Sequence, residues 1–324
     1  MLSFIPAVVE MVVIGLIGPT FLQLTYLESF ILGSVLGAVS PAVVVPRMIK
    51  MIKNKQGTNK GIPHMVIAGG SLDDIVTIVC FTSLLTIEVG DSLNVMTFIN
   101  VPLSIILGVG IGILTGLLLS IIFKKIHMRD SLKLALILGI CFAYVFLESY
   151  ISQWIGFSSL LANITIGITL LAKNALQAHR IAQKCDRLWS ISEIFLFVLV
   201  GASIQLKAIW SLILPAILVI VVGLASRFIA TYSCMIKTNL NFKERLFVSI
   251  SFFPKATVQA TIGGGLLDLG NKLNDQAIIA AGNIVLMVSV VAILLTASFG
   301  ALTIDLTTNK LINRDLVLEN NKPE

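Results

Sequence analysis

Two adjacent acids, Asp73 and Asp74, stand near the middle of a stretch, about 62–87, that is otherwise apolar and long enough to cross a membrane. A charge at the bilayer centre costs from about 3 to more than 10 kcal/mol, depending on the treatment. Such a pair is usually retained because a water-filled cavity lets it hold a cation or a proton. Carboxylate oxygens suit hard cations, and neighbouring carboxylates titrate as one coupled unit. The doublet therefore predicts a polar site inside the membrane, where Asp73 and Asp74 hold a cation or a proton.

The composition of the chain predicts a membrane protein built from helices. Of its 324 residues, 56% are hydrophobic and only 12% are charged, whereas soluble domains carry about 25% charged residues. The apolar runs are about 20 residues long and lack period-two alternation, which indicates helices and not a β-barrel. We expect an all-α polytopic membrane protein with about ten transmembrane helices. The predicted spans are roughly 2–19, 25–46, 62–87, 99–123, 132–150, 155–172, 188–205, 208–235, 245–267 and 277–304.

The distribution of Lys and Arg predicts how these spans are oriented in the membrane. The loops on one side, together with the C-terminal tail, hold nineteen of the 23 basic residues, which predicts that this side and both termini are cytoplasmic. The net charge of +6 is then a topology signal and not a sign of a nucleic-acid partner. The four cysteines form no C-x-x-C pair, so they predict neither a metal site nor a disulfide framework. We expect no cofactor.

Prolines interrupt the second and the ninth span at matching places. Pro41 and Pro254 lie well inside their spans, and proline removes a backbone donor and disfavours helix in the residue before it. Spans one to three and eight to ten thus form two triplets that run in opposite senses, each with a broken middle helix. This pattern is typical of an inverted repeat with two crossed broken helices. We expect one transporter domain, with core helices at about 2–87 and 208–304 and dimerisation-side helices at about 99–205.

Three motifs in combination resemble those of NHA-type sodium/proton antiporters, which belong to the monovalent cation/proton antiporter superfamily. They are residues 37–46, the Asp73-Asp74 pair and residues 253–260, and they occur in that family's order and spacing. The resemblance covers nearly the whole chain. It implies a secondary active antiporter that exchanges Na⁺ or Li⁺ for H⁺ by alternating access, usually as a homodimer in the lipid bilayer.

The resemblance also implies roles for the ionisable residues inside the spans. Asp74 matches the carboxylate that binds the cation and the proton in turn, and Asp73 matches its assisting neighbour. Arg227 and Lys255 match supporting basic residues, and Glu10 matches a buried acid, for which we expect Arg227 as the partner. Lys255 has two interpretations: a counter-charge for Asp73 or for helix ends, which we favour, or a group that releases a proton when Na⁺ binds.

We expect other side chains at the two breaks to lie near the ion site. Oxygen ligands for Na⁺ besides the carboxylates could come from the hydroxyls of Ser40 and Thr257. The remaining broken-helix residues that we expect near the site are Pro41, Pro254 and Gln259.

The chain departs from the family pattern in two respects. Family members often carry an acid soon after a Gly-Ala pair in the seventh span, whereas here Gly201-Ala202 is followed by Ser203, so the ion-pair pattern and the stoichiometry are open. The chain also begins later than family members usually do, and the missing helices often help to build the dimer interface. Either this is a short variant or its N-terminus is missing.

Several other functions remain as alternatives. The same fold could exchange K⁺ for H⁺ or take up an organic anion with Na⁺, and a shortened chain could be an inactive membrane protein. A membrane enzyme would need a nucleophile with a base or a metal cluster, which the sequence does not indicate, and residues 263–265, three glycines, are a weak signal for a phosphate loop. The compact chain favours a prokaryotic plasma membrane.

Overall fold

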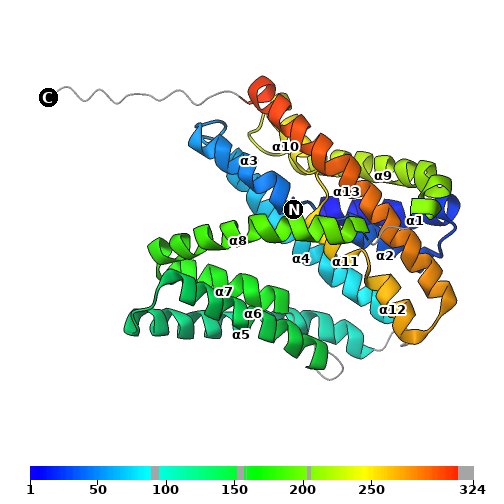
Figure 1. Ribbon diagram of the computed structural model, residues 1–324. Helices are drawn as coiled ribbons and strands as arrows, with labels where there is room; N and C mark the ends of the chain where they lie inside the picture. Colours follow the sequence, from blue (N-terminus) through cyan, green and yellow to red (C-terminus); the bar gives the residue numbers. More distant parts are fainter. Residues whose placement is uncertain (89–94, 152–156, 158, 203–205, 313–324) are drawn as a thin grey trace. The chain divides into compact units, whose positions relative to one another are not determined.

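A computed structural model describes residues 1–88, 95–151, 157, 159–202 and 206–312 of the chain (Figure 1). The regular elements of these residues are thirteen α-helices. They are α1 (Ile5–Leu22), α2 (Tyr26–Leu36), α3 (Pro41–Lys53), α4 (Ile62–Glu88), α5 (Val95–Lys125), α6 (Asp130–Ile151), α7 (Ser159–Lys173), α8 (Ala175–Ala202), α9 (Leu206–Cys234), α10 (Phe242–Ser251), α11 (Thr257–Ile262), α12 (Gly265–Leu273) and α13 (Gln276–Leu311).

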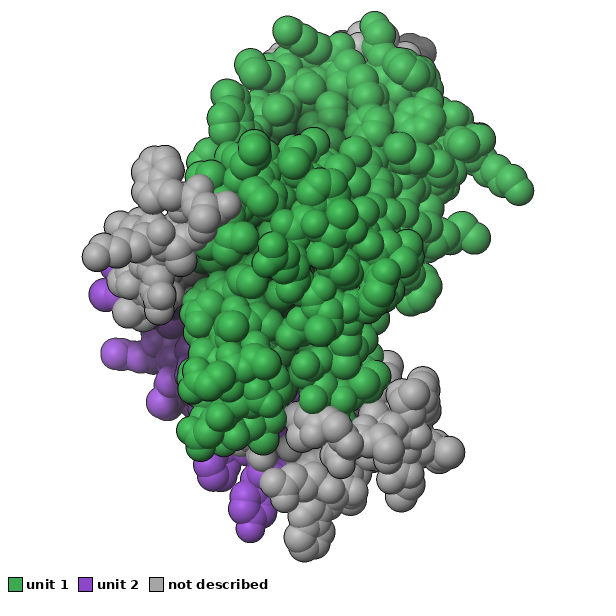
Figure 2. Space-filling model, turned by 90° about the vertical axis from the view of Figure 1, so that its right-hand side faces the viewer, with its two compact units in different colours: residues 1–89, 200–324 green, residues 90–199 purple. Residues whose placement is uncertain are grey.

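The helices form two compact units, which Figure 2 shows in different colours. Unit 1 consists of Met1–Val89 and Val200–Glu324 and contains α1 to α4 and α9 to α13. Unit 2 consists of Gly90–Leu199 and contains α5, α6, α7 and nearly all of α8. The division of the chain into a moving core and a dimerisation part stays a prediction.

Unit 1 contains two interrupted helices, as the prolines predict. One interruption separates α2 from α3, and the other separates α10 from α11. Pro41 is the first residue of α3, a position where the absent N–H leaves no helical hydrogen bond unmade. The backbones of the two breaks meet, because the N–H of Ser40 donates to the carbonyl oxygen of Pro254 at 2.7 Å. The predicted crossing of two broken helices is therefore present.

Capping side chains fix where both broken helices begin. At α2, the hydroxyl of Thr25 accepts from the N–H of Glu28 at 3.2 Å, and the Glu28 carboxylate accepts from the N–H of Thr25 at 2.6 Å. The same reciprocal arrangement joins Asn241 and Glu244 at the start of α10. These capping boxes satisfy orphan donors of the first turn and so define the direction in which each half-helix points.

Helix α2 packs against α1 at very short range, with Gly33 at the contact. A Cβ atom at residue 33 would lie 2.6 Å from the carbonyl oxygen of Met11, so only glycine fits without a shift of the backbone. Around this contact Ile14, Ile31 and Val35 are fully buried. This close approach places the C-terminal end of α2 near Glu10, which lies on α1 one turn before Ile14.

Several helices have the length and composition of membrane spans. Within the described residues, seven helical segments are long and apolar enough to cross a bilayer, and the joined α2–α3 pair counts as one of them. The segment formed by α4 is among them and carries the aspartate doublet near its middle. The approximate count of ten spans corresponds to these segments together with α7, α8 and the broken pair α10–α11.

Helix α8 begins well before its predicted bounds. The basic residues between Lys173 and Arg187 were expected in a loop before a span at 188–205, but α8 already begins at Ala175. Asn174 caps it, since its side-chain oxygen accepts from the N–H of Gln177 at 3.1 Å. Ala, Leu, Gln, Lys and Arg favour helix, and no Gly or Pro interrupts the chain before Gly201, so local propensity extends the helix.

Candidate functional site

The aspartate doublet projects from α4 into a polar region of unit 1. Asp73 is fully buried, and its Oδ2 accepts from Nη2 of Arg227 at 2.6 Å and from the N–H of Val39 at 3.0 Å. Arg227 belongs to α9, and Val39 lies in the break between α2 and α3. Asp73 therefore ties the doublet to both a buried cation and the crossing of the broken helices.

A second acid completes the buried charge network. Oε2 of Glu10, on α1, accepts from Nη1 of Arg227 and from Nζ of Lys255, each at 2.7 Å. All three side chains are at most 1% exposed. The expected pair of Glu10 with Arg227 is present, whereas Lys255 pairs with Glu10 and not with Asp73. Two acids and two bases thus neutralise one another, as burial of charges requires.

The C-terminal end of the half-helix α2 is capped by side chains from three other segments. Nη1 of Arg227 donates to the carbonyl oxygen of Gly37, and Nζ of Lys255 donates to that of Leu36. The amide of Gln259, on α11, donates to the carbonyl oxygens of residues 35 and 38 at 3.0 and 2.9 Å. Helix-end carbonyls lack intrahelical partners and carry partial negative charge, so two cations and an amide stabilise this end. The expected helix-end role of Lys255 is therefore present.

Some oxygens at the crossing have no hydrogen-bond partner among the described residues. They belong to side chains that the sequence places near the site, namely Oδ1 of Asp73, Oδ1 of Asp74, Oγ of Ser40 and Oε1 of Gln259. Asp74 is half-buried and forms no ion pair within the described residues. Buried polar atoms are nearly always satisfied, so these oxygens need a partner other than the described side chains, and oxygen is the ligand type that a hard cation prefers.

The other predicted residues lie at the same breaks with different roles. Thr257 is the first residue of α11 and is half-buried, while Pro254 supplies the carbonyl that accepts from Ser40. Thr77, which lies on α4 and was not predicted, donates its hydroxyl to the backbone carbonyls of the doublet, at 3.1 Å for Asp73 and 3.0 Å for Asp74, and not to their carboxylates. Ser203 lies outside the described residues.

The sequence analysis did not predict one of the residues that support the site. Thr296, on α13, is 5% exposed, and its hydroxyl accepts from the N–H of Lys255 at 2.9 Å. This hydrogen bond holds the backbone of the second break at Lys255, which lies outside the regular helices. The sequence gives little indication of this role, because a single threonine in an apolar span usually bonds only to its own helix. Thr296 also forms such a bond, with the carbonyl of Ala292.

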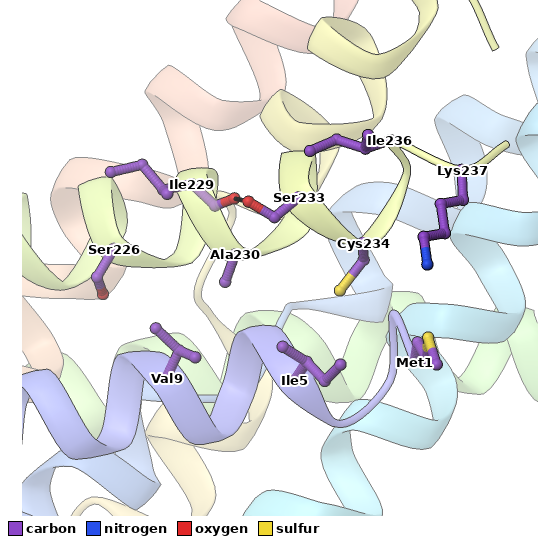
Figure 3. Close-up of a pocket in the computed structure, with 10 residues that line it drawn as sticks. All are labelled: Met1, Ile5, Val9, Ser226, Ile229, Ala230, Ser233, Cys234, Ile236 and Lys237. Atoms are coloured by element: carbon purple, nitrogen blue, oxygen red, sulfur yellow. Dashed lines mark hydrogen bonds between the residues drawn. The ribbon is translucent and has the colours of Figure 1, made fainter.

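A groove of about 730 Å³ runs between α1 and α9 and does not include the site (Figure 3). Val9 and Ser226 line it, each next in sequence to a residue of the charge network, and Lys237 lies at one end. The predicted site residues are not among those that line this groove. The charge network is therefore packed inside unit 1, with 0% exposure of Arg227 and Asp73.

Comparison with known proteins places the chain in a family. The family model described as "Sodium/hydrogen exchanger, transmembrane" matches residues 1–306. The chain belongs to the sodium/hydrogen exchanger family. Sodium/hydrogen exchanger 9B2 of Homo sapiens is 32% identical over 332 residues, covering 100% of this chain and 60% of the relative. Sodium/hydrogen exchanger 9B1 of Homo sapiens is 30% identical over 293 residues, covering 88% of this chain and 55% of the relative.

A solved structure shows the same fold. The sodium proton antiporter MjNhaP1 from Methanocaldococcus jannaschii, determined at pH 8, aligns with a TM-score of 0.81 and 21% identity. The alignment covers 96% of this chain and 77% of the antiporter chain. The predicted antiporter fold and the resemblance to NHA-type antiporters are thereby confirmed, and this exchanger-family chain is an integral membrane protein. It spans about 60% of the length of the curated relatives that it matches.

Proposed function

We propose that the protein is a secondary antiporter that exchanges Na⁺ or Li⁺ for H⁺ at Asp74. The observation that carries the proposal is the charge balance of the buried network. Glu10 and Asp73 are neutralised by Arg227 and Lys255, whereas Asp74 stands beside them without an ion-pair partner among the described residues. A carboxylate in such a place needs a cation or a proton, and it can hold only one of them at a time.

The residues around Asp74 have different roles in the proposed site. Asp73 is held by Arg227 and by the N–H of Val39, so it fixes the geometry of the crossing through one oxygen and offers the other to the ion. The free oxygens of Ser40 and Gln259 supply neutral ligands. Competition between Na⁺ and H⁺ for Asp74 then couples the two fluxes, because the site changes sides only when it is occupied.

We propose that transport proceeds by alternating access, which the division of the chain supports. Every element that supplies a group to the site belongs to unit 1, so this unit can carry the site as one body while unit 2 provides the stationary part. A homodimer in the lipid bilayer is the assembly that we propose. The concentration of basic residues on one side supports cytoplasmic termini. The curated relatives named above are human, so they do not support the expected prokaryotic plasma membrane.

Transport in vesicles tests the proposal. We expect that Na⁺ or Li⁺ added to everted vesicles with an established proton gradient dissipates the gradient, as reported by a pH-sensitive dye. The substitution Asp74→Asn should abolish this response at equal protein levels. A response to K⁺ alone would assign K⁺/H⁺ exchange, and no response to any of the three ions would mean that the chain is inactive by itself.

A further inference from the structure

A basic pocket in unit 2 has no role in the proposed exchange. It has a volume of about 530 Å³ and lies where the loop between α5 and α6 meets the first turns of α8. Of the described residues that line it, four are Lys or Arg, namely Arg129, Lys133, Arg180 and Lys184, and one is an acid, Asp130. Residues 129–133 and 180–184 are far apart in sequence, so folding brings their charges together.

The extension of α8 creates this pocket. Arg180 and Lys184 are four residues apart on a helix, which places them on the same face. Nε of Arg180 lies 3.2 Å from Oδ2 of Asp130, and Nζ of Lys184 donates to the hydroxyl of Ser131 at 2.9 Å. Both contacts reach the first turn of α6, so the two basic side chains point toward the α5–α6 connection.

The charges of the pocket are not balanced by its own residues. Asp130 is shared between Arg180 and Lys133, and Nζ of Lys133 is 3.8 Å from Oδ1 of Asp130, beyond hydrogen-bond distance. The side chain of Lys133 is nevertheless only 7% exposed, and its ammonium lies 5.5 Å from the ring centroid of Phe123. The serine that Lys184 contacts is neutral. The pocket therefore has four cations and one carboxylate, which reaches only Arg180 and the buried Lys133.

We propose that this pocket binds a phosphate group. Arg and Lys donors that converge on a cavity recognise phosphate oxygens through charge-assisted hydrogen bonds, and Arg180 can do so in a bidentate manner. A bound phosphate supplies the negative charge that Asp130 alone does not. The usual explanation of such residues, orientation of the loops in the membrane, requires only their presence on one side and not their convergence on one pocket.

The position of the pocket makes a lipid headgroup one source of the phosphate. The segments Ile106–Lys125 and Asp130–Glu148 are long and apolar enough to span a bilayer, and the pocket lies at the connection between them. Basic pockets at this level of a membrane protein bind anionic headgroups. A soluble phosphate compound offers the same chemistry, and the experiment below separates the two sources.

Ligand-induced stabilisation of the purified full chain tests the proposal. The melting temperature is measured in neutral detergent with added phosphatidylglycerol, with phosphatidylcholine, or with inorganic phosphate. We expect stabilisation by phosphatidylglycerol or by inorganic phosphate and none by phosphatidylcholine. The double variant Arg180→Gln/Lys184→Gln should need an at least about tenfold higher concentration for the same stabilisation, because it loses two charge-assisted bonds. An effect of inorganic phosphate at millimolar concentration identifies a soluble ligand, and an effect of the lipid alone identifies a headgroup.

Two further variants serve as controls for the binding experiment. Lys124→Gln/Lys125→Gln removes the same charge from exposed residues at the end of α5 that do not line the pocket, and it should bind like the native chain. Asp130→Asn removes the competing carboxylate, so it should bind more tightly relative to its own ligand-free melting temperature. The proposal is overturned if neither probe stabilises the protein, if the control pair loses as much affinity as the pocket pair, or if Asp130→Asn weakens binding.

Discussion

The substitution Glu10→Gln probes the buried charge network most sharply. Oε2 of Glu10 accepts from both Arg227 and Lys255 at 2.7 Å, so the change leaves two buried cations with Asp73 as their counter-charge. Removal of one partner from a buried ion pair costs about 3–5 kcal/mol. With an unfolding entropy of about 2.1 cal/mol/K per residue and 324 residues, this loss corresponds to a melting temperature about 4–7 °C lower.

An exposed ion pair of the same unit provides the matched control. Nη2 of Arg47 lies 3.3 Å from Oδ2 of Asp305, and the two side chains are 26% and 50% exposed. Exposed pairs contribute about 0–1 kcal/mol, so Asp305→Asn should lower the melting temperature by no more than about 1–2 °C. Both variants change one carboxylate into an amide, and they differ in the burial of its partners.

A second substitution in the same network distinguishes charge imbalance from lost packing. In Glu10→Gln/Lys255→Met the remaining pair, Arg227 with Asp73, is neutral again, so part of the lost stability should return although Lys255 no longer caps the carbonyl of Leu36. Thermal unfolding in detergent, followed by tryptophan fluorescence, measures all variants. The reasoning is refuted if Glu10→Gln melts within about 1 °C of Asp305→Asn, or if the double variant is no more stable than Glu10→Gln.

Two further outcomes follow from the same contacts. Gln259→Met keeps a similar size but removes both donors to the carbonyls at the end of α2, so we expect a loss of about 1–3 kcal/mol and slower exchange; unchanged thermal unfolding would contradict this role. If Lys255 remains bonded to Glu10 throughout the cycle, one Na⁺ replaces one H⁺ and the rate in proteoliposomes should not respond to an imposed valinomycin–K⁺ potential. A rate that rises with the potential would instead show that Lys255 also releases its proton.

The parts of the fold that follow from strong local signals could be predicted from the sequence. Pro41 and Pro254 each lack a backbone donor and disfavour helix in the residue before them, so the sequence indicates both breaks. The partner of Arg227 could be predicted because few charges fall inside the spans, and a buried guanidinium needs an acid. The two-sided contact of Arg227, which also holds Asp73, depends on helix packing and carries no sequence signal.

The features that were missed depend on context that a single sequence does not display. Counting basic residues treats the stretch from Lys173 to Arg187 as a loop, although its helix propensity and the cap at Asn174 indicate the extension of α8. The roles of Gln259 and Thr296 were missed for another reason. A lone polar side chain in an apolar span reveals that it needs a partner but not which backbone it reaches. The glycines at 263–264 separate α11 from α12.

The central claim is that Na⁺ and H⁺ compete for the carboxylate of Asp74, and calorimetric titration of the purified protein with Na⁺ tests it most directly. The account predicts an apparent affinity that weakens as the pH falls, approaching about tenfold per pH unit once the site is protonated. Repeating the titration in buffers of different ionisation enthalpy should show proton release on Na⁺ binding, and Asp74→Asn should show neither binding heat nor release. Na⁺ affinity that is independent of pH, or binding that persists in Asp74→Asn, would contradict the account.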